Sequence, residues 1–401
     1  MILHRNNIIA LQNIVFVQTV GNRFRNCVFA VPNIARWISG DWARRNCYVD
    51  GMPTTISAWQ HLFEAFAKSR RRFVFAAFIG AAAIQAEALA LELGLPIQCR
   101  PGVDCWLVNL VDHDPGKGFK DFRCGAHGYN GHNGTDIAIR DLRAMDDGVA
   151  VVAAASGTVK AFRDGMADQV PSAAFRKNRK NLYCGNGVLI SHADGWQTQY
   201  CHLRRHSIKV KRGQQIKAGQ RLGFVGHSGF AAFPHVHMTV RHRGKVVDPF
   251  VGSARKGSCG PGARPLWTGP ALKALTKPMT AIYSAGFAPL APKVRAIRKG
   301  LHRDPALSRR APALLLWAEI FWVQAGDKIS LTITGPDGGI VTEHSNVLPK
   351  RQARRMIFAG RKKQGLFWPT GTYEGRIVLH RSNKDGAERQ FELRRTVRLK
   401  D

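Results

Sequence analysis

The sequence predicts a mainly β protein in which an antiparallel, barrel-like β domain precedes a small immunoglobulin-like β-sandwich. The first observation is a series of short alternating apolar and polar runs, separated by Gly- and Asp-rich turns, from about residue 113 to residue 250. The second is another such series over residues 275–401. Apolar runs stay shorter than the roughly 18 residues of a membrane-spanning helix. We therefore expect two folded β domains.

The first 90 residues predict a leader and not a folded domain. Residues 1–66 show no sustained apolar period and no clear strand or helix pattern. Residues 67–90 resemble an export signal, with arginines at 70–72, a short apolar stretch at 73–84 and Ala88-Leu89-Ala90 as a cleavage site. Ser69 to Phe73 matches the twin-arginine export pattern. Residues 1–66 are then a leader or an extension from a misplaced start codon; the alternative is an amphipathic helix at 67–90.

Downstream of this segment, we expect three parts. Residues 91–250 form the first domain, with its core at 113–250, and a polar, basic stretch at 162–183 interrupts it as a surface loop. Residues 251–274 are rich in Gly, Pro and Ser and predict a linker. Residues 275–401 form the β-sandwich.

Six cysteines follow residue 90, an even number that suits an exported, disulfide-bonded chain. Residues 184–201 read as a β-hairpin with its turn at 193–195, which places Cys184 and Cys201 nearly opposite one another at the open end. Cys99 and Cys105 form a second, weaker pair. No CxxC pair is present, which argues against a structural zinc cluster.

The charge balance predicts a polyanionic partner. The chain has 60 Lys and Arg against 27 Asp and Glu, for a formal net charge of +33. Such a charge attracts nucleic acid, anionic lipid or an acidic cell-wall polymer, and charge alone does not choose among them. The basic residues are spread along the chain without a nucleic-acid-binding signature, so we expect no specific nucleic-acid partner.

Two pairs of residues carry metal-binding chemistry. His132 and Asp136 are four residues apart, so on a strand they share a face, and Gly134 between them disfavours a helix. His235 and His237 are two apart in an alternating run and also share a strand face. Two imidazoles and a carboxylate with an open fourth position are the ligands of a catalytic zinc ion. A further imidazole, that of His202, ends a predicted strand.

These residues resemble the lysostaphin/LytM-type zinc endopeptidases, which cut peptide bonds in bacterial peptidoglycan. The resemblance covers about residues 132–250. The four family patterns are H-x-G-x-D, Y-x-H-L, G-Q-x-L-G-x-x-G-x-S-G and P-H-x-H, which occur in that order as His132 to Asp136, Tyr200 to Leu203, Gly219 to Gly229 and Pro234 to His237.

The resemblance implies one Zn²⁺ in the first domain, bound by His132, Asp136 and His237. It also implies that His202 and His235 flank a metal-bound water and share its deprotonation and the stabilisation of the oxyanion. The activity implied is hydrolysis of cross-links or stem peptides in peptidoglycan, by a monomeric protein in the periplasm or cell envelope. Anionic envelope polymers or lipid are further expected partners.

Some positions depart from the family pattern. Phe233 stands where a small residue is usual, and Met238-Thr239 and Cys201 replace other common residues. All five chemical positions are intact, so these differences bear on substrate preference, and Phe233 is expected to narrow the substrate groove. The alternative is a non-catalytic LytM-like protein that binds cell wall and regulates a separate amidase.

Overall fold

The computed structural model describes most of the chain after residue 90 and a few short segments before it. The described residues are 2–3, 6–11, 14–19, 27–30, 91–178, 180–252, 259–302, 307–382 and 387–401. The chain divides into one unit over residues 1–87 and a second over residues 88–401. The predicted export signal at 67–90 lies outside the described residues. In the described part, no helix is long and apolar enough to cross a membrane.

The N-terminal unit contains an antiparallel sheet of four strands, in the order β1 (Ile2–Leu3), β2 (Asn6–Leu11), β3 (Ile14–Thr19) and β4 (Cys27–Ala30). These strands form although the sequence of residues 1–66 shows no clear strand pattern. Ile and Val favour strands, and the runs that carry them here are joined by only two residues, Gln12 and Asn13. Whether this segment is a leader stays a prediction.

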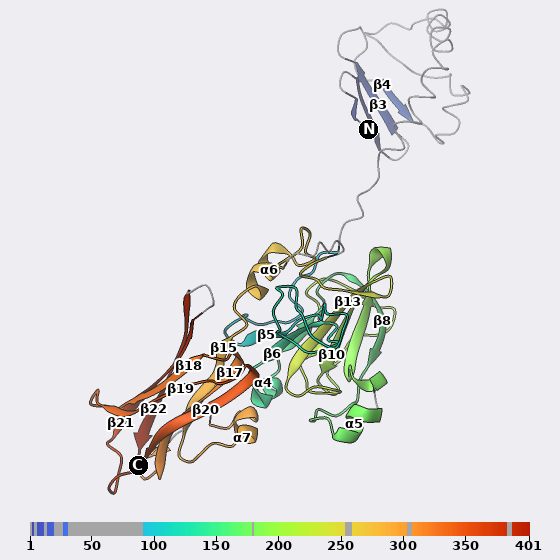
Figure 1. Cartoon of the computed structure of the whole chain (residues 1–401). Coiled ribbons are helices and arrows are strands. Elements are labelled where there is room, and N and C mark those ends of the chain that lie inside the picture. The colour runs from blue at the N-terminus through green and yellow to red at the C-terminus, as the bar shows by residue number, and fades with distance from the viewer. Residues whose placement is uncertain are drawn as a thin grey trace, which may run out of the picture. The chain divides into compact units, whose positions relative to one another are not determined.

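A sheet of eight strands of unequal length forms the scaffold of the first predicted domain (Figure 1). Its order is β11-β8-β9-β10-β13-β6-β5, and β14 also pairs with β13. The strands are β5 (Cys105–Asn109), β6 (Thr135–Ile139), β8 (Gly157–Arg163), β9 (Asn186–Ser191), β10 (Trp196–Leu203), β11 (Gln215–Ile216), β13 (His235–His242) and β14 (Lys245–Val247). A separate pair joins β7 (Ala150–Val152) to β12 (Arg221–Phe224).

Short helices occupy the connections of this domain. They are α4 (Leu142–Asp147), α5 (Ala173–Asn178) and single 3₁₀ turns at Lys180–Leu182 and Ala193–Gly195. The basic insertion expected as a plain loop thus contains α5, because Ala173 and Ala174 at its start are strong helix formers. The 3₁₀ turn at 193–195 closes the predicted hairpin, since β9 and β10 pair antiparallel on either side of it.

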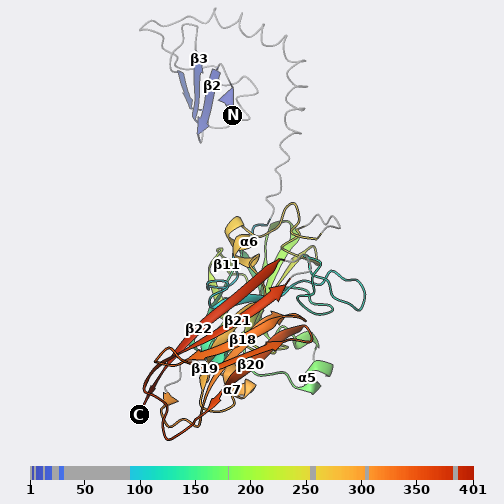
Figure 2. The same ribbon diagram turned by 60° about the vertical axis from the view of Figure 1, so that its left-hand side comes forward.

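Two further sheets pack as the β-sandwich (Figure 2). One has the order β15-β17-β20, and the other β16-β22-β21-β18-β19. Their inward residues form a shared apolar cluster that includes Phe287, Leu331 and Ile377. The strands are β15 (Ala281–Ala288), β16 (Leu307–Ser308), β17 (Ala313–Val323), β18 (Lys328–Thr334), β19 (Ile340–Val347), β20 (Gln352–Lys362), β21 (Gly371–Ser382) and β22 (Glu388–Lys400). The mainly β class is therefore confirmed.

The segment expected as a linker is partly a core element. Leu266 and Trp267 are buried, and Leu93 pairs with Trp267 in a parallel bridge. Helix α6 (Gly269–Leu275) follows and buries Ala271 and Leu275, while α7 (Val294–Arg298) lies further along. The Gly and Pro residues of 251–274 mark turns between buried positions, so composition alone predicted too much exposure. The exact domain bounds stay a prediction.

Three disulfides form within the described residues. Cys184–Cys201 and Cys99–Cys105 confirm the two predicted pairs. The third, Cys124–Cys259, joins a loop before β6 to the segment after β14, across 135 residues of sequence. Such a pair has no local signal, because neither cysteine lies in a hairpin that would align it with the other.

The loop that contains Cys124 is organised by a buried carboxylate. Asp121 is 1% exposed; its Oδ1 accepts hydrogen bonds from the amides of Arg123 and Gly125, and its Oδ2 accepts from the amide and Nδ1 of His127. Burial raises the pKa of Asp121, but the hydrogen bonds from His127 and Gly125 together outweigh burial and lower that pKa to about 2. The ionised carboxylate is therefore the form that stabilises the loop.

We expect Asp121→Asn to lower the free energy of unfolding at pH 7 by about 2 kcal/mol, the equivalent of a pKa shift from 3.8 to about 2. Because the folded-state pKa is depressed, this stability is complete above about pH 4 and disappears as the pH falls through about 2. Urea unfolding of wild type and variant should therefore converge between these pH values. Asp146→Asn, at an exposed position, is the control, and a difference that does not change with pH would contradict the assignment.

Candidate metal centre

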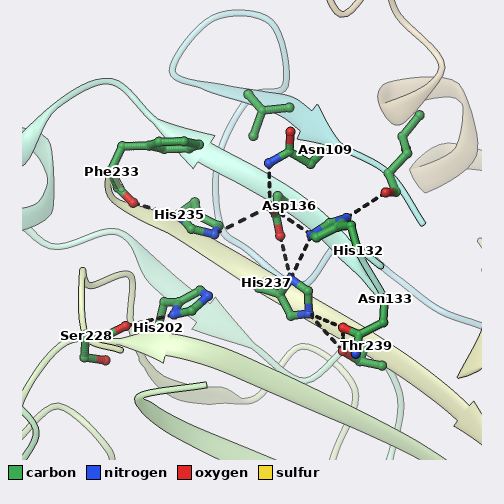
Figure 3. A network of polar contacts seen from close by, with 12 residues as sticks. Asn109, His132, Asn133, Asp136, His202, Ser228, Phe233, His235, His237 and Thr239 are labelled. Atoms are coloured by element: carbon green, nitrogen blue, oxygen red, sulfur yellow. Dashed lines mark hydrogen bonds and ion pairs between the residues drawn. The ribbon is translucent and has the colours of Figure 1, made fainter. Parts of the chain in front are cut away.

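Three ligand atoms from two neighbouring strands and one loop converge in the first domain (Figure 3). They belong to His132, Asp136 and His237 and lie within 4.8 Å of one another. His132 Nε2 is 3.1 Å from Asp136 Oδ2, and His237 Nδ1 is 2.7 Å from Asp136 Oδ1. His132 and Asp136 are buried and His237 is nearly so. Two imidazoles and one carboxylate, converging and shielded from water, fit a zinc ion.

The register of the sheet explains how Asp136 and His237 meet. Strand β6 pairs antiparallel with β13, and Asp136 is directly opposite His237. Residues opposite one another project to the same face, so the carboxylate and the imidazole are neighbours. Ile137 and Ile139 on the same strand are buried in the core.

His132 reaches the site by a different route from the one predicted. It lies in the loop before β6, which starts only at Thr135, so it does not share a strand with Asp136. Gly134 makes this possible, because a Cβ there would lie 2.6 Å from the His237 ring. The loop thus passes tightly against His237 and returns His132 to the same point.

Groups behind the three ligands fix which atoms face inward. His132 Nδ1 donates to the carbonyl of Leu110 at 2.6 Å, which leaves Nε2 for a metal. The amide of Asn109 donates to Asp136 Oδ2 at 2.8 Å. His237 Nε2 contacts Thr239 Oγ1 at 2.9 Å and leaves Nδ1 facing inward. Sequence reasoning missed these supporting residues, which belong to none of the quoted patterns.

Two more imidazoles, those of His202 and His235, face the same point. Their ring centroids are 4.6 Å apart, and His235 Nε2 lies 3.6 Å from Asp136 Oδ2. His202 Nδ1 donates to the carbonyl of Ser228 and His235 Nδ1 to that of Phe233, each at 2.8 Å. A neutral imidazole whose Nδ1 is the donor carries its lone pair on Nε2. Both residues therefore present a proton acceptor toward the site.

The backbone at His202 is unusual. Its φ of 62° is left-handed, in a stretch of β10 where the pairing with β9 shifts between Tyr200 and Leu203. The amide of His202 donates to the carbonyl of Cys184 at 2.8 Å, and the Cys184–Cys201 disulfide lies beside it. Strained backbone of this kind persists only where the surroundings fix it. The disulfide and the hairpin thus hold His202 toward the other imidazoles.

Electrostatics favour a charged carboxylate, and the imidazoles differ in the direction of their pKa shifts. Burial lowers the pKa of His132, but the charge of Asp136 and a hydrogen bond to it outweigh burial and raise that pKa. Burial raises the pKa of Asp136, but the surrounding imidazoles outweigh it and hold that pKa well below its ordinary value. Burial lowers the pKa of His202 well below its ordinary value, and His235 and His237 lower it further. Burial also lowers the pKa of His237. Neutral imidazoles are the forms that bind a metal or accept a proton.

The part of the chain that contains this site is similar to known peptidases. Residues 130–249 match the family model described as Peptidase family M23. Peptidoglycan DD-endopeptidase ShyA of Vibrio cholerae is 33% identical over 117 residues, which span 29% of this chain and 22% of that protein. DD-carboxypeptidase/endopeptidase Mpg of Neisseria meningitidis is 40% identical over 73 residues, 18% of this chain and 16% of that protein.

Among solved structures, the catalytic domain of lysostaphin from Staphylococcus simulans is 21% identical, with a TM-score of 0.23, over 35% of this chain and 85% of that one. The chain thus matches only about a fifth of the length of these curated relatives. The family model at 130–249 spans the five candidate site residues. Residues 130–249 of this chain form a peptidase family M23 domain.

Proposed function

We propose that this protein is an exported, zinc-dependent endopeptidase that hydrolyses peptide bonds in bacterial peptidoglycan. The observation that carries the proposal is the convergence of His132, Asp136 and His237 on one point, with His202 and His235 facing it. Similar proteins include two named for DD-endopeptidase activity on peptidoglycan. The proposed substrates are the cross-links or the stem peptides of peptidoglycan.

His132, Asp136 and His237 would hold the zinc ion. When bound, zinc supplies a Lewis acid that activates water and polarises the scissile carbonyl. Around it, His202 and His235 each offer an Nε2 that accepts a proton and, once protonated, donates one to the oxyanion or the leaving amine. Because their Nδ1 atoms are bound to backbone carbonyls, both rings keep this orientation through the reaction.

Export and substrate attraction have independent support. Disulfides persist in oxidising compartments such as the periplasm, and the described residues contain three. The net charge of +33 favours the anionic polymers and lipids of the cell envelope. The disulfides also agree with the export signal that the sequence of residues 67–90 predicts.

The direct test is release of peptides from isolated peptidoglycan by the purified protein loaded with one equivalent of zinc. We expect soluble peptides with newly formed amino groups. A zinc chelator should stop the release and added zinc should restore it. The imidazoles and the carboxylate of the site are Lewis bases, so the proposed reaction depends on the zinc ion as its Lewis acid. Zinc bound with no release from peptidoglycan of several chemotypes would contradict the proposal and favour the non-catalytic regulator.

A further inference from the structure

The β-sandwich contacts the strand that supports the metal ligands. Trp322, near the end of β17, donates its indole Nε1–H to the carbonyl of Val108 in β5, at 2.5 Å. The pairing of β5 with β6 shifts between Leu107 and Asn109, so Val108 lies at an irregularity of the sheet. Its carbonyl is thereby available to a donor from outside the sheet.

Val108 begins a run of three residues that supports two metal ligands. Asn109 donates its side-chain amide to Asp136, and the Leu110 carbonyl accepts from His132. Trp322 donates a hydrogen bond to the carbonyl of Val108, the first residue of the same run. A shift of this run by a few tenths of an ångström would misdirect both His132 and Asp136, because each contact is a single short hydrogen bond.

Trp322 is itself rigidly held. Its backbone is left-handed, with φ of 50°, and its carbonyl accepts from Thr280 Oγ1 at 2.8 Å and from the Arg381 guanidinium at 3.0 Å. Arg381 in turn makes two hydrogen bonds to buried Asp327, at 2.8 and 2.7 Å. Bidentate pairs of this kind fix orientation as well as position. The indole therefore acts as a fixed support.

A second contact reaches His235. The Phe233 carbonyl accepts from His235, and the Phe233 ring packs under the Arg354 guanidinium of β20, which lies 4.9 Å from the ring centroid. Arg354 is held by the Tyr283 hydroxyl at 2.6 Å and by buried Glu319 at 3.2 Å. The Phe233 ring also lies against β17, with its centroid 6.3 Å from that of Phe321.

We propose that the β-sandwich is a positioning part of the metal centre. Trp322 fixes the run from Val108 to Leu110 that orients His132 and Asp136, and Arg354 fixes Phe233, which orients His235. The inference rests on the proposed function for the identity of the metal and of the reaction. It goes beyond that function because it assigns site-building residues to a domain outside the family match at 130–249.

The first test is Trp322→Phe in the full chain, which removes the N–H donor and keeps an aromatic ring. We expect zinc affinity, measured by competition with a chromophoric chelator, to fall about tenfold, the lower end for loss of a group behind a metal ligand. Trp317→Phe is the matched control. Trp317 lies on the same strand, is 1% exposed, and among the described residues its indole N–H has no hydrogen-bond partner. That variant should keep wild-type affinity.

Equal zinc affinity in Trp322→Phe and Trp317→Phe would overturn the inference, whether or not the protein cleaves peptidoglycan. A wild type that binds zinc without cleaving would contradict the proposed function, and the affinity comparison would still decide the inference.

The second test, Arg354→Met, applies if Trp322→Phe does not fold. We expect kcat to fall about tenfold with KM and zinc affinity unchanged, because Arg354 supports His235 and no ligand, and Arg354→Lys should recover part of kcat. An unchanged kcat would contradict the proposed role of Arg354 in positioning His235.

Discussion

Replacing His237 with alanine is expected to weaken zinc binding roughly thousandfold and to reduce peptide release to background. Three protein ligands share the binding free energy, and taking about a third of the 10–16 kcal/mol typical of zinc sites gives on the order of 4 kcal/mol for one ligand. Asp136 also loses its 2.7 Å partner, so a buried carboxylate is left less well paired. Zinc content by mass spectrometry and chelator competition would measure the first effect.

The control for this variant is His242→Ala. His242 lies on the same strand, β13, but stacks on Trp196 with ring centroids 4.2 Å apart and is remote from the three ligand atoms. We expect it to keep both zinc and activity. Retention of wild-type zinc affinity by His237→Ala would remove His237 from the ligand set and with it the proposed metal centre.

The second large effect is expected for His202→Asn, which should lower kcat by about 10²–10⁴ while zinc affinity stays near that of wild type. His202 offers a proton-accepting Nε2 but is outside the group of three ligands. Asparagine is chosen because it tolerates the left-handed backbone, φ of 62°, better than alanine does. Steady-state kinetics on a soluble peptidoglycan fragment would separate kcat from KM.

His206→Asn is the matched control, because His206 has a similar φ of 59° but is exposed in a loop after β10. It should be fully active. If His202→Asn were equally active, the general-base role would fall to His235 alone. If it lost zinc instead, His202 would be a ligand.

The convergence of the five candidate site residues was predictable because each lies in a short local pattern. The two-residue spacing of His235 and His237 fixes their common face once the segment is a strand, and the structure has that strand. His132 was placed on a strand that begins three residues too late to include it. It still arrives at the site, because Gly134 and the Leu110 carbonyl, and not strand geometry, direct it.

The supporting groups were not predictable, for a physical reason. Backbone carbonyls such as those of Val108 and Leu110 carry no sequence signal, since every residue has one. Trp322 reads as an ordinary core residue of the β-sandwich, and its partner is 214 residues away. Likewise the Gly- and Pro-rich segment at 251–274 gave no sign that Trp267 would be buried. Contacts of this range depend on how whole sheets pack.

The hydrogen bond between Trp322 and Val108 has a consequence for the order of events during synthesis. The last site residue, His237, comes 85 residues before Trp322, and at about 5–20 residues per second these residues take roughly 4–17 s to translate. During that interval the ribosome-bound chain already contains all five site residues but lacks the indole that supports them. We therefore expect the nascent chain to bind zinc poorly until the C-terminal sheets are complete.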